Sequence, residues 1–292
     1  MAFLIREYTS STPRLPTALA VIPAAGGTVS VIVREGDTIP NGGGTFSKFD
    51  SFNIPWMHNG AVVFYGRGTS RSGIYEWSGG SLSMVVDSTT ARPGGGTFSG
   101  TFGTEPVKDG QDYAFIYSSA LYRKKNGTFS LVANSLTPVP GGTGNLSIYT
   151  SPSLRSGRLI FHATRSASPA EFGIYLHTDD GITPIVDTRT DFGTPGKVPV
   201  SYGLARSGAW VNDSAIAFRV TFSDKSTAIY KATFQPAAGE FTGRVVFTGP
   251  RTGTITVTSR SGYTYALLRT TTLTAADQQQ VSSLAGTGND LV

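Results

Sequence analysis

The chain has 292 residues, of which 39% are hydrophobic and 15% charged, with a net charge of +5 and no cysteine. This charge is too small for the dense basic surface of a nucleic-acid-binding protein, and the lack of cysteine excludes disulfides, thiolate catalysis and zinc–thiolate sites. No run approaches the ~20 apolar residues of a membrane span, so we expect no transmembrane segment.

The N-terminal segment predicts two strands, TALAVI at 17–22 and TVSVIVREGDT at 28–38, joined by a glycine-rich turn. The stretch before them has scattered prolines and no sustained apolar run, so no signal peptide is visible.

Three phrases then recur in a fixed order, about fifty residues apart. A glycine-rich turn, such as PNGGGTF at 40–46 and PGGGTF at 93–98, recurs at Pro40, Pro93, Pro140 and Pro195. An aromatic residue ends an apolar strand at Phe64, Phe115, Phe161 and Phe218. A tyrosine in phrases such as GIY follows at Tyr75, Tyr122, Tyr175 and Tyr230. Strand patterns, and no Gly-Lys-Ser/Thr, follow the first two glycine phrases, so we interpret them as crossovers between sheets and not as phosphate loops.

These repeats predict an all-β fold in a single domain over 1–292, a five-bladed β-propeller of four-stranded antiparallel blades. A fifth copy begins near 253 and supplies two strands, so the last blade is predicted to be closed by both termini. The blades are predicted over about 39–92, 93–139, 140–194 and 195–250, and over 251–292 combined with 17–38. The phrase TAADQQQVSSL at 274–284 predicts a short helix, or a tail, within 271–292.

The motifs HNGAVVF, SGRLIF and NDSAIAF, together with GIY and PGGGTF, resemble the bacterial tandem-repeat proteins named for an N-x-x-G-x-x-A-F motif. The resemblance covers nearly the whole chain and implies a propeller-like fold and an exported or envelope-associated protein. It carries over no catalytic residue. The copies also depart from the motif, because Asn59 stands directly before Gly60 and Asp213 replaces a glycine.

Aromatic residues are the candidate ligand-binding side chains. Tyr149 and Tyr202 recur in register with Phe52 and Phe102, which indicates packing between blades, although their hydroxyls could also face a groove. Large aromatics that do not recur are better candidates for specific contacts, since packing would tend to repeat them. The candidate set is Trp56, Trp77, Tyr149, Tyr202 and Trp210.

Catalytic chemistry is weakly supported by the sequence. A glycosidase needs converging carboxylates, yet Glu105 is the one acid on the predicted innermost strands, with Asp50 and Asp109 beside them. Three isolated histidines do not predict a metal site, and we predict no catalytic residue and no cofactor. These histidines are His58, His162 and His177.

The leading function is therefore non-catalytic recognition, a scaffold that binds a protein partner and is compatible with an oligomer or larger assembly. A lectin with glycan sites between blades is the first alternative, and a glycoside hydrolase is the second. For a scaffold, we expect one non-repeating patch, and the basic cluster YRKKNG at 122–127 is predicted to be a solvated hairpin turn.

Overall fold

The computed structural model shows an all-β protein built from antiparallel sheets, with no α-helix among the described residues. Within this part of the chain, no helix is long and apolar enough to cross a membrane. The structure describes all residues except 1, 6–16, 23–25, 50–54, 104, 166–170, 194–195, 205–210, 235–242, 250–251, 259–263, 270–278, 286–289 and 292.

The N-terminal sheet has the order β1-β2-β3. Its strands are β1 (Ala2–Ile5), β2 (Ala18–Val21) and β3 (Ser30–Arg34). Strand β1 pairs with β2 and places Phe3 opposite Ala20. The edge of β2 that the predicted closure assigns to the C-terminal strands is thus occupied by β1, and closure of a five-bladed ring is not confirmed.

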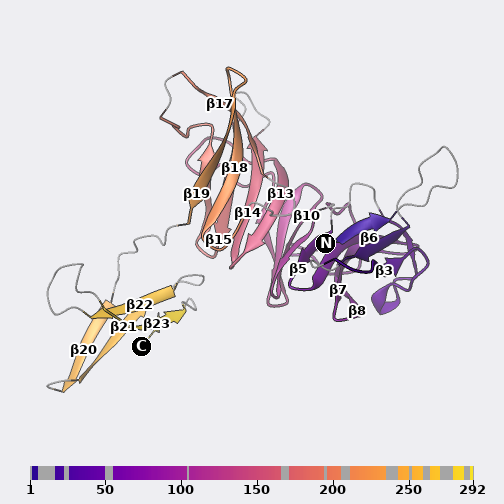
Figure 1. Cartoon of the computed structure of the whole chain (residues 1–292), viewed down its shortest axis with the longest axis horizontal. Helices are drawn as coiled ribbons and strands as arrows, with labels where there is room; N and C mark the ends of the chain where they lie inside the picture. Colours follow the sequence, from indigo (N-terminus) through magenta and orange to yellow (C-terminus); the bar gives the residue numbers. More distant parts are fainter. Residues whose placement is uncertain are drawn as a thin grey trace.

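Four sheets follow in chain order, here numbered I to IV, and Figure 1 shows them side by side. Sheet I contains β4 (Phe46–Lys48), β5 (Trp56–His58), β6 (Ala61–Gly68), β7 (Ser72–Ser78) and β8 (Ser81–Asp87). Sheet II contains β9 (Val107–Asp109), β10 (Asp112–Tyr117), β11 (Ala120–Lys125) and β12 (Thr128–Ala133). Sheet III contains β13 (Ile148–Arg155), β14 (Arg158–Arg165), β15 (Glu171–Thr178) and β16 (Gly181–Asp187). Sheet IV contains β17 (Pro199–Gly203), β18 (Ala215–Phe222) and β19 (Thr227–Thr233).

The two strand anchors found in the sequence pair across neighbouring strands in each of these sheets. Aromatic rings therefore lie side by side at the same place in every sheet, where they can stack. The pairs are Phe64–Tyr75, Phe115–Tyr122, Phe161–Tyr175 and Phe218–Tyr230.

A β-bulge next to the tyrosine anchor also recurs, and it explains the glycine of the GIY phrase. The register shifts between Ile74 and Tyr75 in sheet I and between Ile174 and Tyr175 in sheet III. A Cβ added to Gly73 would lie 2.3 Å from the carbonyl oxygen of Val86. The bulge brings the neighbouring backbone so close that only glycine fits without a shift.

The first three glycine-rich phrases form closed loops before the next sheet, and the fourth begins at Pro195, which lies outside the described residues. In the loop that follows sheet I, Ala91 pairs with Thr97, and the N–H of Arg92 donates to the carbonyl of Gly96. The first such loop includes the single turn of 3-10 helix η1 (Pro40–Gly42). Each loop delivers a buried apolar residue to the core, which is Phe46, Phe98 or Leu146.

Hydrophobic clusters join each sheet to the next. One cluster combines Leu19 and Val33 of the N-terminal sheet with Phe64 of sheet I. A second runs from sheet I through sheet II to sheet III. A third combines Ile174 of sheet III with Phe218 of sheet IV. Burial of apolar area between consecutive sheets is therefore what holds the series together.

Sheet IV differs from the sheets before it. Its third strand, β19, has no outer neighbour among the described residues. Ile229 of β19 is 70% exposed, whereas Ile74, at the same place in sheet I, is 1% exposed. The same position is thus a core residue or a surface residue according to whether another sheet covers it.

The C-terminal strands pair only with one another and lie apart from sheets I to IV in Figure 1. They are β20 (Gly243–Gly249), β21 (Thr252–Thr258), β22 (Thr264–Arg269), β23 (Gln279–Ala285) and β24 (Asp290–Leu291). The predicted helix over 274–284 is wrong where the chain is described, because its second half lies in β23. Val281, Ser282 and Ser283 are modest helix formers, and pairing with β22 outweighs their local preference. The proposed helix start at Thr274 lies outside the described residues.

Candidate functional site

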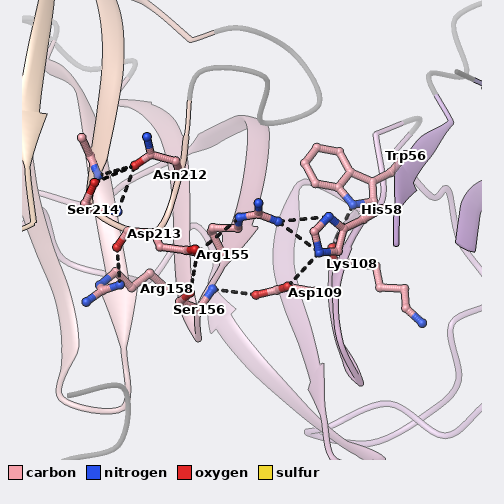
Figure 2. A network of polar contacts seen from close by, with 11 residues as sticks. Trp56, His58, Lys108, Asp109, Arg155, Ser156, Arg158, Asn212, Asp213 and Ser214 are labelled. Carbon is pink, nitrogen blue, oxygen red and sulfur yellow. Dashed lines mark hydrogen bonds and ion pairs between the residues drawn. The ribbon is translucent and has the colours of Figure 1, made fainter. Parts of the chain in front are cut away.

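The turns that connect the first two strands of sheets I to IV carry a network of polar contacts (Figure 2). In sheets I and III these are two-residue hairpin turns. Both central residues have positive φ, with 48° at Ser156 and 73° at Gly157. Such a turn matches the twist of the paired strands and favours glycine at its second position. The flanking side chains are thereby held on rigid backbone.

One sequence position supplies a polar residue to each of these turns. It lies six residues before the strand aromatic, and the residue type differs in every sheet. The residues at this position are His58, Asp109, Arg155 and Asn212. All of them belong to the network in Figure 2, so the packing of sheets gathers residues about fifty positions apart in the sequence.

His58, Asp109 and Arg155 form the inner part of the network. The His58 Nε2 atom lies 3.3 Å from Asp109 Oδ1. The Nη1 atom of Arg155 lies 3.0 Å from the His58 ring nitrogens. The second carboxylate oxygen of Asp109 accepts a hydrogen bond from the Ser156 N–H, at 2.6 Å. Sheets I, II and III are thus joined through one carboxylate and one guanidinium.

Asp213 extends the network to sheet IV. Its Oδ1 accepts a hydrogen bond from Ser156 Oγ, at 2.6 Å, and lies 3.4 Å from Arg155 Nε. Its carbonyl accepts from Arg158 Nη1 at 3.1 Å. Side-chain exposure rises from 18% at His58 to 73% at Asp213, so the Asp213 end of the network is the more accessible to solvent.

A buried support lies beneath the network. The indole Nε1–H of Trp56 donates to the carbonyl of Lys108 at 2.8 Å, which ties sheet I to sheet II. The Lys108 ammonium lies 2.6 Å from the Glu76 carboxylate, and both side chains are buried. The Tyr113 hydroxyl donates to the same carboxylate, and burial together with Glu76 raises the pKa of Tyr113. Losing one member would leave a buried charge unpaired, so this support resists rearrangement.

The opposite end of the sheets is built from a repeated corner. Asp87 Oδ1 accepts hydrogen bonds from the N–H and hydroxyl groups of both Thr89 and Thr90. Asn134 and Asp187 accept from the backbone two residues further on in the same way. These side chains satisfy turn hydrogen bonds, which is a common role of Asp and Asn.

The candidate tyrosines connect these corners to the next sheet. The Tyr149 hydroxyl donates to the Asn134 carbonyl at 2.6 Å, and the Tyr202 hydroxyl donates to the Asp187 carbonyl at 2.7 Å. Both rings are buried, and burial raises the pKa of Tyr149 to about 12. The structure therefore places both residues between sheets, where their hydroxyls are already engaged.

The candidate tryptophans are dispersed. Trp56 is 8% exposed and bonded to Lys108, as described above. Trp77 packs against the cluster between the N-terminal sheet and sheet I. Trp210 lies outside the described residues. A ligand role for these aromatics stays a prediction, and the structure brings no two of them into one open site among the residues it describes.

The histidines also occupy separate places. Burial lowers the pKa of His162, and burial followed by the charge of Arg123 lowers the pKa of His177 to about 4. The described residues contain no group of three or more His, Asp or Glu side chains that could hold a metal ion. Only His58 belongs to the polar network.

The hairpin turn predicted at 122–127 is present, with Asn126 and Gly127 exposed at its tip, but the basic residues before it are not all solvated. Arg123 is 2% exposed and pairs with the Asp112 carboxylate, while its Nη2 also donates to the Gly157 carbonyl at 2.9 Å. Lys124 Nζ donates to the Val85 carbonyl at 2.7 Å. Buried partners on adjacent sheets outweigh the preference of these side chains for water.

The network presents charged groups together with hydrogen-bond donors and acceptors. Ser156 Oγ donates to Asp213 and is not directed at the His58–Asp109 pair, so the described residues hold no activated nucleophile there. Glu105, the candidate acid of a glycosidase, is not part of the network, and Asp50 lies outside the described residues.

Sequence reasoning missed Arg155, Ser156 and Asp213, and considered His58 and Asp109 only as an isolated histidine and a flanking acid. The sequence does contain a signal that could have located these residues. Within copies that otherwise recur, one turn position is polar in every copy and different in each. Variation at a fixed place in a repeated frame would have pointed to this site.

Comparisons with known proteins do not identify a family. No protein-family model matches the sequence, and no curated protein matches it significantly. Among solved structures, the chain is similar to a puromycin-hydrolyzing peptidase of Mycobacterium tuberculosis, with 13% identity and a TM-score of 0.29. The match covers 70% of this chain and spans only 34% of the peptidase chain. A likeness of this size carries no conclusion about fold or activity.

Proposed function

We propose that this protein is a non-catalytic recognition module that binds a protein partner through the polar turns of sheets I to IV. The observation that carries the proposal is the network of His58, Asp109, Arg155 and Asp213. Its members come from the turns of four sheets. Three of them, His58, Asp109 and Arg155, are different residues at one equivalent position, and Asp213 follows that position in sheet IV. Polar contacts between them hold them on short turns. A preorganised, non-repeating polar surface of this kind favours one specific partner, because little ordering is needed on binding.

The proposal includes a five-bladed propeller as the frame of this surface. Strands β2 and β3 support it, because they have the same bulge, between Leu19 and Ala20, that sheet I has between Ile74 and Tyr75. This matches the third and fourth strands of a blade. The exposed Ile229 of sheet IV occupies the position that a following blade covers in the other sheets. The C-terminal strands would then supply the first two strands of the shared blade.

Closure of the ring can be tested by measuring the distance between two spin labels. Because the chain has no cysteine of its own, the labels attach only at two introduced cysteines. In sheet I, one rung runs from Trp56 through Val63 and Glu76 to Ser83. The equivalent ends of a shared blade are Thr258 and Ser30. Spin labels on Ser30→Cys and Thr258→Cys should therefore have backbones about 15 Å apart, which is three strand spacings. A distance distribution centred far beyond this value would reject the closed ring.

Partner binding can be tested with matched ion pairs. The Arg155–Asp213 pair lies in the network, and the Lys197–Asp224 pair lies elsewhere on sheet IV, with contacts of 3.4 Å in both cases. The immobilised protein is used to capture partners from its native host, with quantitative comparison of Arg155→Ala, Asp213→Ala, Lys197→Ala and Asp224→Ala. We expect one specific protein to be lost with the first two variants and retained with the last two.

Equal capture by all four variants would contradict the proposed surface. A glycan array measured in parallel separates the lectin alternative. Saturable binding to one sugar class, without a protein partner, would replace the present proposal with glycan recognition.

A further inference from the structure

A cavity between sheets III and IV lies beside the turn network and shares Ser156 and Arg158 with it. The cavity has a volume of about 280 Å³ and is reached by Lys125 of sheet II. Apolar side chains form much of its wall, including Leu176, Pro184 and Phe234, while Arg158 and Asp179 contribute charge. Apolar walls with a few fixed polar groups are typical of small-molecule sites.

Arg158 is the distinctive group of this cavity. Its side chain donates to the Asp213 carbonyl, at 3.1 Å, and its guanidinium carbon lies 5.2 Å from the centre of the Phe234 ring. Among the described residues, Arg158 forms no ion pair. The other cation of the cavity is compensated, because Lys125 Nζ lies 2.9 Å from the Asp179 carboxylate. Arg158 therefore lines the cavity as a positive charge that no carboxylate of the described residues pairs with.

The position of Arg158 is fixed from two sides. It follows the rigid Ser156–Gly157 turn, and its guanidinium lies against an aromatic face, which favours a planar cation. A guanidinium held in this way can donate two parallel hydrogen bonds to one carboxylate or sulfonate group. The apolar wall beside it would then cover the body of the bound molecule.

We propose that this cavity binds a small organic anion, a carboxylate or sulfonate on an aromatic or aliphatic body, with the anionic group on Arg158. The site is independent of partner recognition by the turn network. It shares Ser156 and Arg158 with that region, but it needs neither His58 nor Asp109. Failure of one proposal thus leaves the other standing.

The test uses two fluorescent probes that differ in charge. The full-length protein is titrated with 8-anilinonaphthalene-1-sulfonate and with the neutral N-phenyl-1-naphthylamine, which lacks the sulfonate. We expect saturable binding of the anionic probe at one site. Arg158→Ala should weaken it at least tenfold, while the neutral probe changes less than twofold. Unlabelled 3-phenylpropionate should displace the anionic probe, and its amide should not.

Three further variants make the result decisive. Thr183→Trp should fill the cavity and abolish binding of both probes, because Thr183 lines its wall. Lys231→Ala removes a positive charge from exposed β19 without altering the lining, so binding should be unchanged. Ile229→Ser tests the exposed apolar residue of sheet IV as a competing site. Equal affinity of the anionic probe for the wild type and Arg158→Ala, or its loss in Ile229→Ser instead, would overturn the proposal. Unchanged melting curves and circular dichroism establish that each variant is folded.

Discussion

The two ends of the stacked sheets differ in how equivalent positions of the repeat are used. At one end, Asp87, Asn134 and Asp187 each close a turn in the same way. At the other end, the equivalent turn position holds a different polar residue in every sheet, such as His58 or Arg155. Repetition at the first end follows from a shared backbone requirement. In a repeated fold, therefore, positions that differ between copies are the better candidates for function, and positions that recur are the better candidates for structure.

Removing the carboxylate of Asp87 should give the largest effect at the repeated end. Asp87 is fully buried, accepts hydrogen bonds from Thr89 and Thr90, and pairs with Arg71. Asp87→Ala leaves these donors unsatisfied, so we expect a loss of about 3 kcal/mol in the free energy of unfolding. Urea denaturation measures it. Asp224→Ala is the matched control, because Asp224 closes an exposed turn before Ser226 and its removal should change stability little. Equal losses in both variants would show that burial of the corner is not what matters.

The Asp87 carboxylate should also make the free energy of unfolding depend on pH. Burial alone would raise the pKa of Asp87, but hydrogen bonds from Thr89 and Thr90 and the charge of Arg71 hold it below its ordinary value. The unfolded chain therefore binds this proton more readily. The stabilisation is present above about pH 4 and is lost as the pH falls toward the folded pKa.

Asp87→Asn separates this contribution from other acid effects. Asparagine already closes the equivalent corner at Asn134, so the variant should fold. Unfolding curves between about pH 3 and 6 should show a shallower pH slope for the variant than for the wild type. Parallel slopes would mean that other carboxylates govern acid unfolding.

A smaller loss of stability is expected where the turn at Asp187 contacts sheet IV. The Tyr202 hydroxyl donates to the Asp187 carbonyl in a buried environment. Tyr202→Phe should cost about 1 kcal/mol of unfolding free energy, since it removes one buried hydrogen bond and keeps the ring. Tyr230→Phe is the control, because within the described residues its hydroxyl makes no hydrogen bond. Equal costs would assign the effect to the ring environment and not to the hydroxyl.

The smallest effect on stability is expected at the variable end. Arg155 contacts His58 and Asp213, but the pair with Asp213 is largely exposed, and such pairs contribute less than about 1 kcal/mol. Arg155→Ala should thus shift the urea midpoint only slightly while it abolishes partner capture. A large loss of stability would show that Arg155 mainly stabilises the fold and would contradict its role as a recognition residue.

The frame was largely predictable because its signals are local or periodic. Strand patterns and the recurring Phe64 and Tyr75 anchors locate neighbouring strands, and the structure pairs these two anchors with each other. The network was not predictable in the same way, because Asp109 and Arg155 meet only after two sheets pack. The strand pairings near the two termini could not be predicted for a related reason. The edge of β2 accepts β1, and β23 pairs with β22, through contacts that local propensity does not encode.

The exposed Ile229 has a consequence for the behaviour of the protein in concentrated solution. It lies on β19, whose outer edge is unpaired among the described residues, and Val200 on β17, the other edge strand of sheet IV, is also exposed. An unpaired edge with apolar side chains is a template on which a second chain can add a strand. If the proposed fifth blade does not cover this edge, sheet IV should favour self-association. A charged residue in place of Ile229 would keep the molecules apart without altering either of the two binding surfaces.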